Sequence, residues 1–165
     1  MEPVLRDATL ADAQFLFDLR TDHDVVAASA AHPPVDFAQH LLWLECAIQD
    51  PDRRLFIIEA EDYAPDEHGD EVFTPLKIGQ CRLDLIDYGR SAEVSIALIR
   101  AARGHGIGTA ALKILALAAA SLGIRWLEAV IKETNHASRK AFLKAGYSVE
   151  EIKDGVVHMG YKCGS

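Results

Sequence analysis

Hydrophobic and polar residues follow two distinct spacings in the middle of the chain. Val94, Ile96 and Leu98 alternate with small or polar residues, which is the pattern of a half-buried strand. A stretch rich in Ala and Leu then runs from about residue 107 to 122 with Lys113 as its only charge, which favours a helix. Glycines at alternate positions lie between the two. The pattern therefore predicts a strand, a glycine-rich turn and a helix in succession.

The same spacings recur along the rest of the chain and predict an α/β fold. The predicted strands cover residues 3–7, 54–59, 76–86, 92–99, 126–131, 147–153 and 156–163. The predicted helices cover residues 9–20, 36–48, 107–122 and 135–146. Asp36 and Gln39 form a capping box at the start of the second helix. The fifth strand runs parallel to the fourth because a helix joins them, and the last two strands form a hairpin about Asp154-Gly155.

Two stretches lack these patterns. Residues 21–34 are small and polar, which predicts a loop or a broken helix. Its His23, Asp24 and His32 are either exposed loop residues or contacts to a substrate. Residues 61–75 hold six acidic residues and no Lys or Arg, which predicts a solvated, mobile hairpin loop. An acidic flap that attracts a cationic amine is the alternative for this segment.

Composition and charge narrow the class of protein. The 165 residues suit one domain spanning 1–165, and half of them are hydrophobic, as in a globular protein. The net charge of −8 argues against binding to nucleic acid. No apolar run reaches about 18 residues, so we expect no membrane span. The opening Met1-Glu2-Pro3 leads straight into charged residues without a signal peptide, which predicts a cytoplasmic protein.

The cysteines indicate neither disulfides nor a metal site. Cys46, Cys81 and Cys163 are odd in number and show no zinc-type spacing with each other or with His. We therefore expect a reducing compartment and no metal cofactor.

The segment Arg103-Gly104-His105-Gly106-Ile107-Gly108-Thr109 carries the clearest chemical signal. Its glycines let successive N–H groups point outward at the start of a helix, which is the arrangement that holds a pyrophosphate. The glycine spacing differs from a dinucleotide-binding fingerprint, and no Gly-Lys-Ser/Thr follows, which excludes a Walker loop.

Arg103 to Gly108 resembles the Arg/Gln-x-x-Gly-x-Gly/Ala motif of the GNAT superfamily of N-acetyltransferases. The segment from Asn135 to Tyr147 is similar to the family's second pattern, Asn-x-x-Ser, seven residues, then Gly-Phe/Tyr. The resemblance covers roughly residues 76–150. It implies a mixed central sheet of about seven strands with helices on both faces, and acetyl-CoA as the acetyl donor.

The resemblance also implies where acetyl-CoA lies. The turn's N–H groups would take the pyrophosphate, the open edge of the fourth strand would pair with the pantetheine arm, and the Leu98 N–H would face the thioester oxygen. Asn135 would bind the arm, cap its own helix, or do both. The residues expected to contact the cofactor are Leu98, Ile99, Arg103, Gly104, His105, Gly106, Ile107, Gly108, Thr109, Asn135, Ser138 and Phe142.

Proton transfer is the least defined part of the resemblance. Glu93 lies where some family members carry a catalytic glutamate, so it is the expected base; a solvent-facing carboxylate is the alternative. Phe142 stands where many members have a Tyr that protonates the leaving thiolate, and a phenyl ring donates no proton. Tyr147, His136, His158 or a water molecule remain as substitutes.

A weak base and no Tyr suit an amine of low pKa. An α-amino group of pKa about 7.7–8.0 is far closer to neutral at pH 7 than an alkyl amine of about 10.4. Segments 19–22, 40–44 and 52–55 also loosely resemble the GNAT branch that acetylates nucleotide-linked amino sugars. We therefore favour an amino sugar or a protein N-terminus as acceptor. A non-catalytic acyl-CoA-binding module is the alternative function, and nothing in the sequence decides for or against a homodimer.

Overall fold

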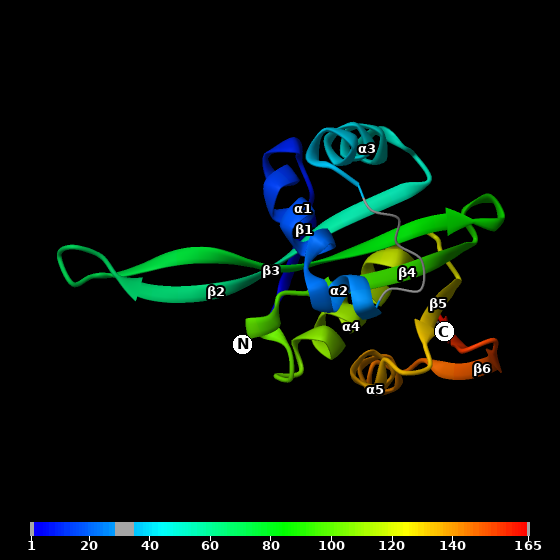
Figure 1. The fold of residues 1–165 in the computed structure, drawn as a ribbon. Helices are drawn as coiled ribbons and strands as arrows, with labels where there is room; N and C mark the ends of the chain where they lie inside the picture. Colours follow the sequence, from blue (N-terminus) through cyan, green and yellow to red (C-terminus); the bar gives the residue numbers. More distant parts are fainter. Residues whose placement is uncertain (1, 29–34, 165) are drawn as a thin grey trace.

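A computed structural model describes residues 2–28 and 35–164. Within them, seven strands form one mixed sheet in the order β1-β2-β3-β4-β5-β7-β6 (Figure 1). The predicted parallel pairing of β4 with β5 is confirmed, and the other neighbours are antiparallel. The strands are β1 (Val4–Asp7), β2 (Arg53–Pro65), β3 (Glu71–Ile86), β4 (Ser91–Leu98), β5 (Trp126–Lys132), β6 (Ser148–Lys153) and β7 (Val156–Lys162).

Helices cover both faces of this sheet, as the sequence predicts (Figure 1). Leu16 of α1 and Leu44 of α3 pack with Ile57 of β2 on one face. The larger cluster on the other face includes Leu112 of α4 and Phe142 of α5. The helices are α1 (Ala13–Thr21), α2 (His23–Ala28), α3 (Phe37–Gln49), α4 (Ile107–Ser121) and α5 (His136–Lys144), with one-turn helices η1 (Leu10–Asp12), η2 (Asp87–Gly89) and η3 (Arg100–Ala102).

Helix α4 is the central element of the larger core. Leu112, Leu115, Ala116 and Ala119 are buried at the spacing of a single helix face. Burial of each of these leucines contributes about 2 kcal/mol to folding. Leu117 on the opposite side is 73% exposed. The sheet and α4 together therefore fix the position of the glycine-rich turn that precedes this helix.

Local signals in the sequence placed several element ends correctly. The predicted capping box is present, because Asp36 Oδ1 accepts from the Gln39 N–H (2.8 Å) and Gln39 Oε1 accepts from the Asp36 N–H (3.2 Å). Asp154 (φ 53°) and Gly155 (φ 79°) form the predicted turn of the last hairpin.

The predicted hairpin over residues 61–75 is present, but the prediction that all of this segment is loop is wrong. Strands β2 and β3 continue through it and pair from Glu61–Pro65 to Glu71–Pro75, which makes a long two-stranded arm (Figure 1). Only the tip turns, where Asp66 Oδ1 accepts from the His68 N–H (2.8 Å) and the Asp70 N–H (2.9 Å). A projecting ribbon leaves both faces open to solvent, so a dense run of charge does not prevent strand formation here.

The stretch 21–34 is a broken helix as far as the structure describes it. Helix α1 ends at Thr21, and α2 begins at His23 and ends at Ala28. The carboxylate of Asp22 accepts from the Asp24 N–H (3.0 Å) and the Val25 N–H (3.1 Å), which starts the second helix. His32 and the Pro-Pro pair lie outside the described residues.

Candidate active site

The glycine-rich turn becomes the first turn of α4, which begins at the buried Ile107. Gly104 (φ 78°) and Gly106 (φ 77°) have left-handed backbone angles that favour glycine. The first helical hydrogen bond runs from the Ala110 N–H to Gly106 O (3.1 Å). In the described part of the chain, the N–H groups of residues 104–109 have no hydrogen-bond partner, and they lie at the positive end of the helix dipole. This arrangement can hold a pyrophosphate.

The remaining turn residues pack the start of α4 between β4 and α5. A Cβ on Gly108 would lie 3.6 Å from Leu98 Cδ1 and 3.8 Å from Ala141 Cβ, which is ordinary contact. The Thr109 hydroxyl donates to Ala141 O at 3.5 Å, a long hydrogen bond. His105 is exposed on the outer side of the turn. The turn is therefore fixed on its inner side and open on its outer side.

Strands β4 and β5 separate after a short paired stretch. Residues 91–93 of β4 pair with residues 126–128 of β5. Beyond that point β4 still pairs with β3 up to Leu98, opposite Gly79, whereas β5 pairs with β7 alone among the described strands. One edge of β4 from residue 94 to 98 therefore keeps backbone groups without a partner among the described residues, apart from Leu98 O, which accepts from Arg103. An extended chain with amide groups can pair with them.

The free edge distinguishes Leu98 from Ile99. The Ile99 N–H donates to Ile78 O (2.9 Å) on the β3 side. Leu98 O points the other way and accepts from Arg103 Nε (3.1 Å). Because backbone groups alternate sides along a strand, the Leu98 N–H faces the open edge. Of the two residues predicted here, only Leu98 has its N–H directed toward a ligand in the gap.

Arg103 connects the turn to the segment between α1 and α2. Its guanidinium donates to Asp24 Oδ2 (3.0 Å), to Asp22 Oδ1 (3.5 Å) and to Leu98 O. Hydrogen bonds from the Val25 N–H first, then the Asp24 N–H and Arg103, hold the pKa of Asp22 below its usual range. No signal in the sequence connects Asp22 and Asp24 with a residue about eighty positions later, so this joint was not predicted.

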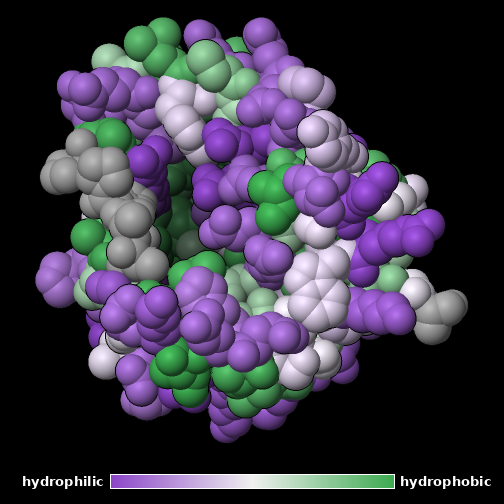
Figure 2. Space-filling view, turned by 90° about the vertical axis from the view of Figure 1, so that its right-hand side faces the viewer, coloured by the Kyte–Doolittle hydropathy of each residue, from purple (hydrophilic) through white to green (hydrophobic). Residues whose placement is uncertain are grey.

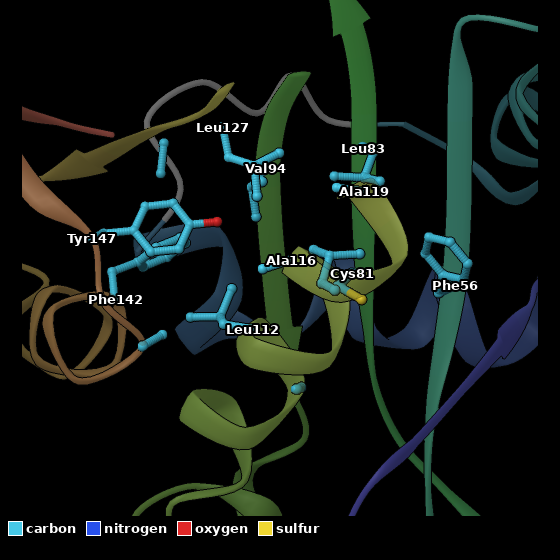
Figure 3. Close-up of a cluster of buried hydrophobic side chains, with 14 of the residues drawn as sticks. Phe56, Cys81, Leu83, Val94, Leu112, Ala116, Ala119, Leu127, Phe142 and Tyr147 are labelled. Atoms are coloured by element: carbon cyan, nitrogen blue, oxygen red, sulfur yellow. The ribbon is translucent and has the colours of Figure 1, made fainter. Parts of the chain in front are cut away.

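The second motif places Asn135 at the N-cap of α5, and Ser138 and Phe142 within the first two turns of that helix. Asn135 Oδ1 accepts from the Ser138 N–H (3.2 Å), so the expected capping role is present. Phe142 is 2% exposed and meets Tyr147 edge to face at 4.8 Å (Figure 3). Burial raises the pKa of Tyr147, whose hydroxyl has no partner among the described residues. In Figure 3 this hydroxyl points away from α5 toward β4.

Glu93 is exposed at the last position where β4 and β5 pair. It lies directly opposite Asp84 of β3 and Glu128 of β5, so three carboxylates share one face of the sheet in one row. Both oxygens of Asp84 pair with Arg53 and Arg82, so Glu93 and Glu128 are the two members of the row that can attract a cation to the point where the strands separate. The sequence pointed to Glu93 but not to its two neighbours, because their alignment depends on the register of three strands.

A cavity of about 290 Å³ lies beside this row, lined in part by Glu128, Glu150, Glu151 and His158. Figure 2 views the molecule from the side where β3 passes into β4. The surface there has a hollow with a hydrophobic floor, and hydrophilic residues border it on the right-hand side. This side of the molecule therefore offers room for a small polar ligand.

Metal sites and membrane spans are two further kinds of feature that residues 2–28 and 35–164 could carry. No cluster of three or more His, Cys, Asp or Glu side chains suits a metal ion there. None of the helices in these ranges has both the length and the apolar character that a bilayer crossing requires. The cysteines are free, with Cys81 and Cys163 buried and Cys46 exposed.

Comparison with known proteins identifies the family of this chain. The profile of the acetyltransferase (GNAT) domain family matches residues 4–148. A curated relative, YwnH of Bacillus subtilis, is named as a candidate phosphinothricin acetyltransferase and is 39% identical over 75 residues. That alignment covers 46% of this chain and 46% of the relative, so the chain spans about half the length of the curated protein it matches.

Solved structures share the fold over nearly the whole chain. Spermidine N-acetyltransferase of Vibrio cholerae, in complex with CoA and spermine, has a TM-score of 0.78 at 17% identity and covers 98% of this chain and 95% of its own. Phosphinothricin acetyltransferase of Sinorhizobium meliloti, in complex with acetyl-CoA, has a TM-score of 0.73 at 23% identity and covers 99% of this chain and 90% of its own. Because the family profile matches residues 4–148, which is most of the chain, this chain belongs to the GNAT acetyltransferase family.

Proposed function

We propose that this protein is an N-acetyltransferase that moves the acetyl group of acetyl-CoA to a primary amine of a small molecule. One observation carries the proposal: the open edge of β4 leads directly into a turn whose N–H groups, at residues 104–109, have no partner in the described chain. The open edge fits an extended arm that contains amide groups, and the turn fits a pyrophosphate, so the two features together fit a ligand that has both. Relatives named for spermidine and phosphinothricin acetylation support a small-molecule acceptor.

Acetyl-CoA supplies an acetyl group activated as a thioester. The turn holds its pyrophosphate, and the free edge of β4 aligns the pantetheine arm. The Leu98 N–H donates to the thioester oxygen as negative charge develops on it, an interaction worth about 3 kcal/mol in other acyl transfers. Glu93 lies five residues before Leu98 on β4, about 16 Å along the strand, so it accepts the proton of the attacking amine through a chain of water molecules rather than directly.

Tyr147 is the residue that we place as proton donor to the leaving thiolate. It packs on Phe142, which occupies the family's usual donor position, and its buried hydroxyl is without a partner in the described residues. His136 is exposed and His158 lines the cavity beyond β5, which favours Tyr147. Tyr147→Phe should lower kcat about tenfold without loss of stability, because it removes only an unsatisfied buried oxygen. An unchanged kcat would mean that Tyr147 is not the proton donor and would favour a water molecule in that role.

Amino sugars, including nucleotide-linked ones, are the favoured acceptors, and protein N-termini are the second class. The test is release of free thiol from acetyl-CoA across amino sugars, peptide N-termini, polyamines, aminoglycosides and phosphinothricin. Turnover with one class establishes the reaction and the acceptor together. Tight binding of acetyl-CoA without turnover of any amine would instead favour a non-catalytic acyl-CoA-binding module.

Gly106→Glu tests the cofactor seat. At φ 77° the glutamate strains the turn and repels the pyrophosphate, so we expect acetyl-CoA affinity to fall by more than tenfold in calorimetry. Gly123→Glu is the matched control, because Gly123 (φ 84°) also has open space around it but follows the opposite end of α4. Equal affinities of the two variants would contradict the placement of the pyrophosphate.

A further inference from the structure

Three arginines surround one indole ring on the face of the sheet that α1 and α3 cover. The guanidinium carbons of Arg20, Arg53 and Arg82 lie 5.4, 5.7 and 5.9 Å from the centroid of the Trp43 ring. They come from α1, β2 and β3, and Trp43 comes from α3. We call these three arginines and Trp43 the arginine patch.

The charges of the arginine patch are not balanced. Asp84 is its carboxylate, with Oδ1 2.7 Å from Arg53 Nε and Oδ2 2.9 Å from Arg82 Nε. Arg20 forms no ion pair with any described residue. Three guanidinium groups therefore have one carboxylate in direct contact, since Glu93, opposite Asp84 on β4, forms no ion pair with them in the described residues. Burial and the nearby Arg82 lower the pKa of Arg20, which is the mark of a cation without enough counter-charge.

The hydrogen-bonding capacity of the patch is also largely unused. Arg53 and Arg82 each bind Asp84 through Nε, and their terminal nitrogens donate to no other described group. The side chains of both are 28% exposed, so a ligand can reach them. A planar guanidinium with free terminal N–H groups binds phosphate or carboxylate in a bidentate manner.

His40 forms part of the floor beneath the patch without adding charge. It is 1% exposed and lies 5.6 Å from the Trp43 ring and 5.5 Å from the Phe17 ring. Burial, and then the adjacent Arg20, lower its pKa, so the imidazole is neutral near pH 7. An apolar floor of this kind strengthens the attraction between the arginines above it and an anion.

The patch adjoins the point where β4 leaves β5. In the register of β3 with β4, Arg82 is opposite Ser95 and Asp84 is opposite Glu93. Opposed residues of antiparallel strands have Cα atoms about 5 Å apart and point to the same face. The Ser95 hydroxyl is buried and has no partner among the described residues. An acceptor that lies along the open edge of β4 between Glu93 and Leu98 passes Ser95, and can therefore reach Arg82 with a second group.

We propose that the arginine patch binds an anionic group, phosphate or carboxylate, carried by the acceptor amine. This inference rests on the proposed N-acetyltransferase function and narrows its substrate class. Glu93 attracts the ammonium form of the acceptor to the open edge of β4, the amine reacts toward the Leu98 end of that edge, and the patch takes the anionic end. Purely cationic amines place a second positive charge against three arginines and are disfavoured.

Matched pairs of acceptors test the proposal and separate the two sources of charge. Glucosamine 6-phosphate is compared with glucosamine for phosphate, and an α-amino acid with its amide for carboxylate. We expect kcat/KM to favour the anionic member of at least one pair by tenfold or more. Arg20→Gln should reduce that ratio about tenfold, whereas Arg125→Gln, an exposed arginine outside the patch, should leave it unchanged. Equal ratios in the wild type and Arg20→Gln would overturn the proposal, because a merely structural role affects both members alike.

A second measurement does not depend on turnover. With CoA present at saturation to fill the turn, inorganic phosphate should raise the unfolding midpoint of the wild type and of Arg125→Gln. The phosphate concentration needed should be at least fivefold higher for Arg20→Gln. No phosphate effect, or the same effect in all three proteins, would overturn the arginine patch as an anion site. Absence of turnover with every amine would count against the N-acetyltransferase function, and the phosphate measurement would still decide the patch.

Discussion

Two clusters of charged side chains on the α1–α3 face differ in their balance of charge. In the first, Asp12 Oδ1 is 2.8 Å from Arg6 Nη2 and 2.7 Å from Lys77 Nζ, and Arg6 Nε is 2.6 Å from Glu59. Two cations meet two carboxylates, and the Asp12 side chain is 1% exposed. In the second, Arg53 and Arg82 share Asp84, whose side chain is 25% exposed, and Arg20 has no carboxylate partner among the described residues.

This difference in charge balance distinguishes a cluster that stabilises the fold from one that can bind a ligand. Buried charges need partners for every group, because desolvation otherwise costs several kcal/mol. The Asp12 cluster meets that need within the chain and joins β1, β3 and the start of α1. The arginine patch stays half-exposed with cations in excess, so its balance requires a group from outside. Two substitutions and two changes of solution conditions test this difference between the clusters, from the largest expected effect to the smallest.

Asp12→Asn should have the largest effect on stability. It leaves Arg6 and Lys77 without their shared buried carboxylate, and we expect a loss of about 3 kcal/mol in the free energy of unfolding. Asp7→Asn is the control, because the Asp7 side chain is 70% exposed and its pair with Arg54 is 3.3 Å long. That variant should lose less than about 1 kcal/mol. Similar losses in urea unfolding would show that the first cluster does not hold the fold.

Acid should remove the stabilisation by the Asp12 carboxylate in the wild type. Hydrogen bonds from Arg6 first, and then from Lys77 and the Thr9 N–H, hold the pKa of Asp12 well below its usual range. Since the folded pKa is lowered, the stabilisation is complete above the unfolded pKa of about 3.9 and declines as pH falls below it. The stability gap between wild type and Asp12→Asn should be constant from pH 6 to 8 and narrow by about 1.4 kcal/mol per pH unit below about pH 4. A stability difference between the wild type and Asp12→Asn that widened in acid would contradict a lowered pKa of Asp12 in the folded protein.

Asp84→Asn should act differently from Asp12→Asn. It removes the one carboxylate of the arginine patch, so stability should fall by only about 1 kcal/mol. The added net positive charge should tighten phosphate binding about threefold. Thermal unfolding against phosphate concentration measures both effects. Weaker phosphate binding would mean that Asp84 is needed chiefly to orient Arg53 and Arg82.

Salt should have the smallest effect and should separate the clusters once more. Raising ionic strength from about 0.05 to 0.5 M shortens the Debye length from about 14 to 4 Å. The KM of an anionic acceptor should rise a few fold, since the patch is open to solvent. The stability gap between wild type and Asp12→Asn should change by less than about 0.5 kcal/mol, because the Asp12 carboxylate is buried. A KM that salt leaves unchanged would argue against electrostatic binding at the patch.

Local patterns in the sequence were reliable guides where the chemistry is local. Caps at Asp36 and Asn135, the hairpin turn at Asp154-Gly155 and the start of α4 depend on residues within a few positions of each other. The error over residues 61–75 arose because a high density of charged residues was taken to predict a loop. Both faces of the β2–β3 arm are open to solvent, so charged side chains are compatible with strands there.

The sequence alone determined the family, the alternation of strands and helices, and the glycine turn at the positive end of α4, because glycine angles and helix spacing act over a few residues. The tertiary structure decided the rest of the candidate site. The separation of β4 from β5, the row at Glu93 and the joint from Arg103 to Asp24 all depend on strand register or packing. Arg20, Trp43 and Arg53 lie in segments that the sequence singled out, but Arg82 and the excess of charge emerge only when four elements pack together. Charge balance is a property of neighbours in space, and no local pattern specifies it.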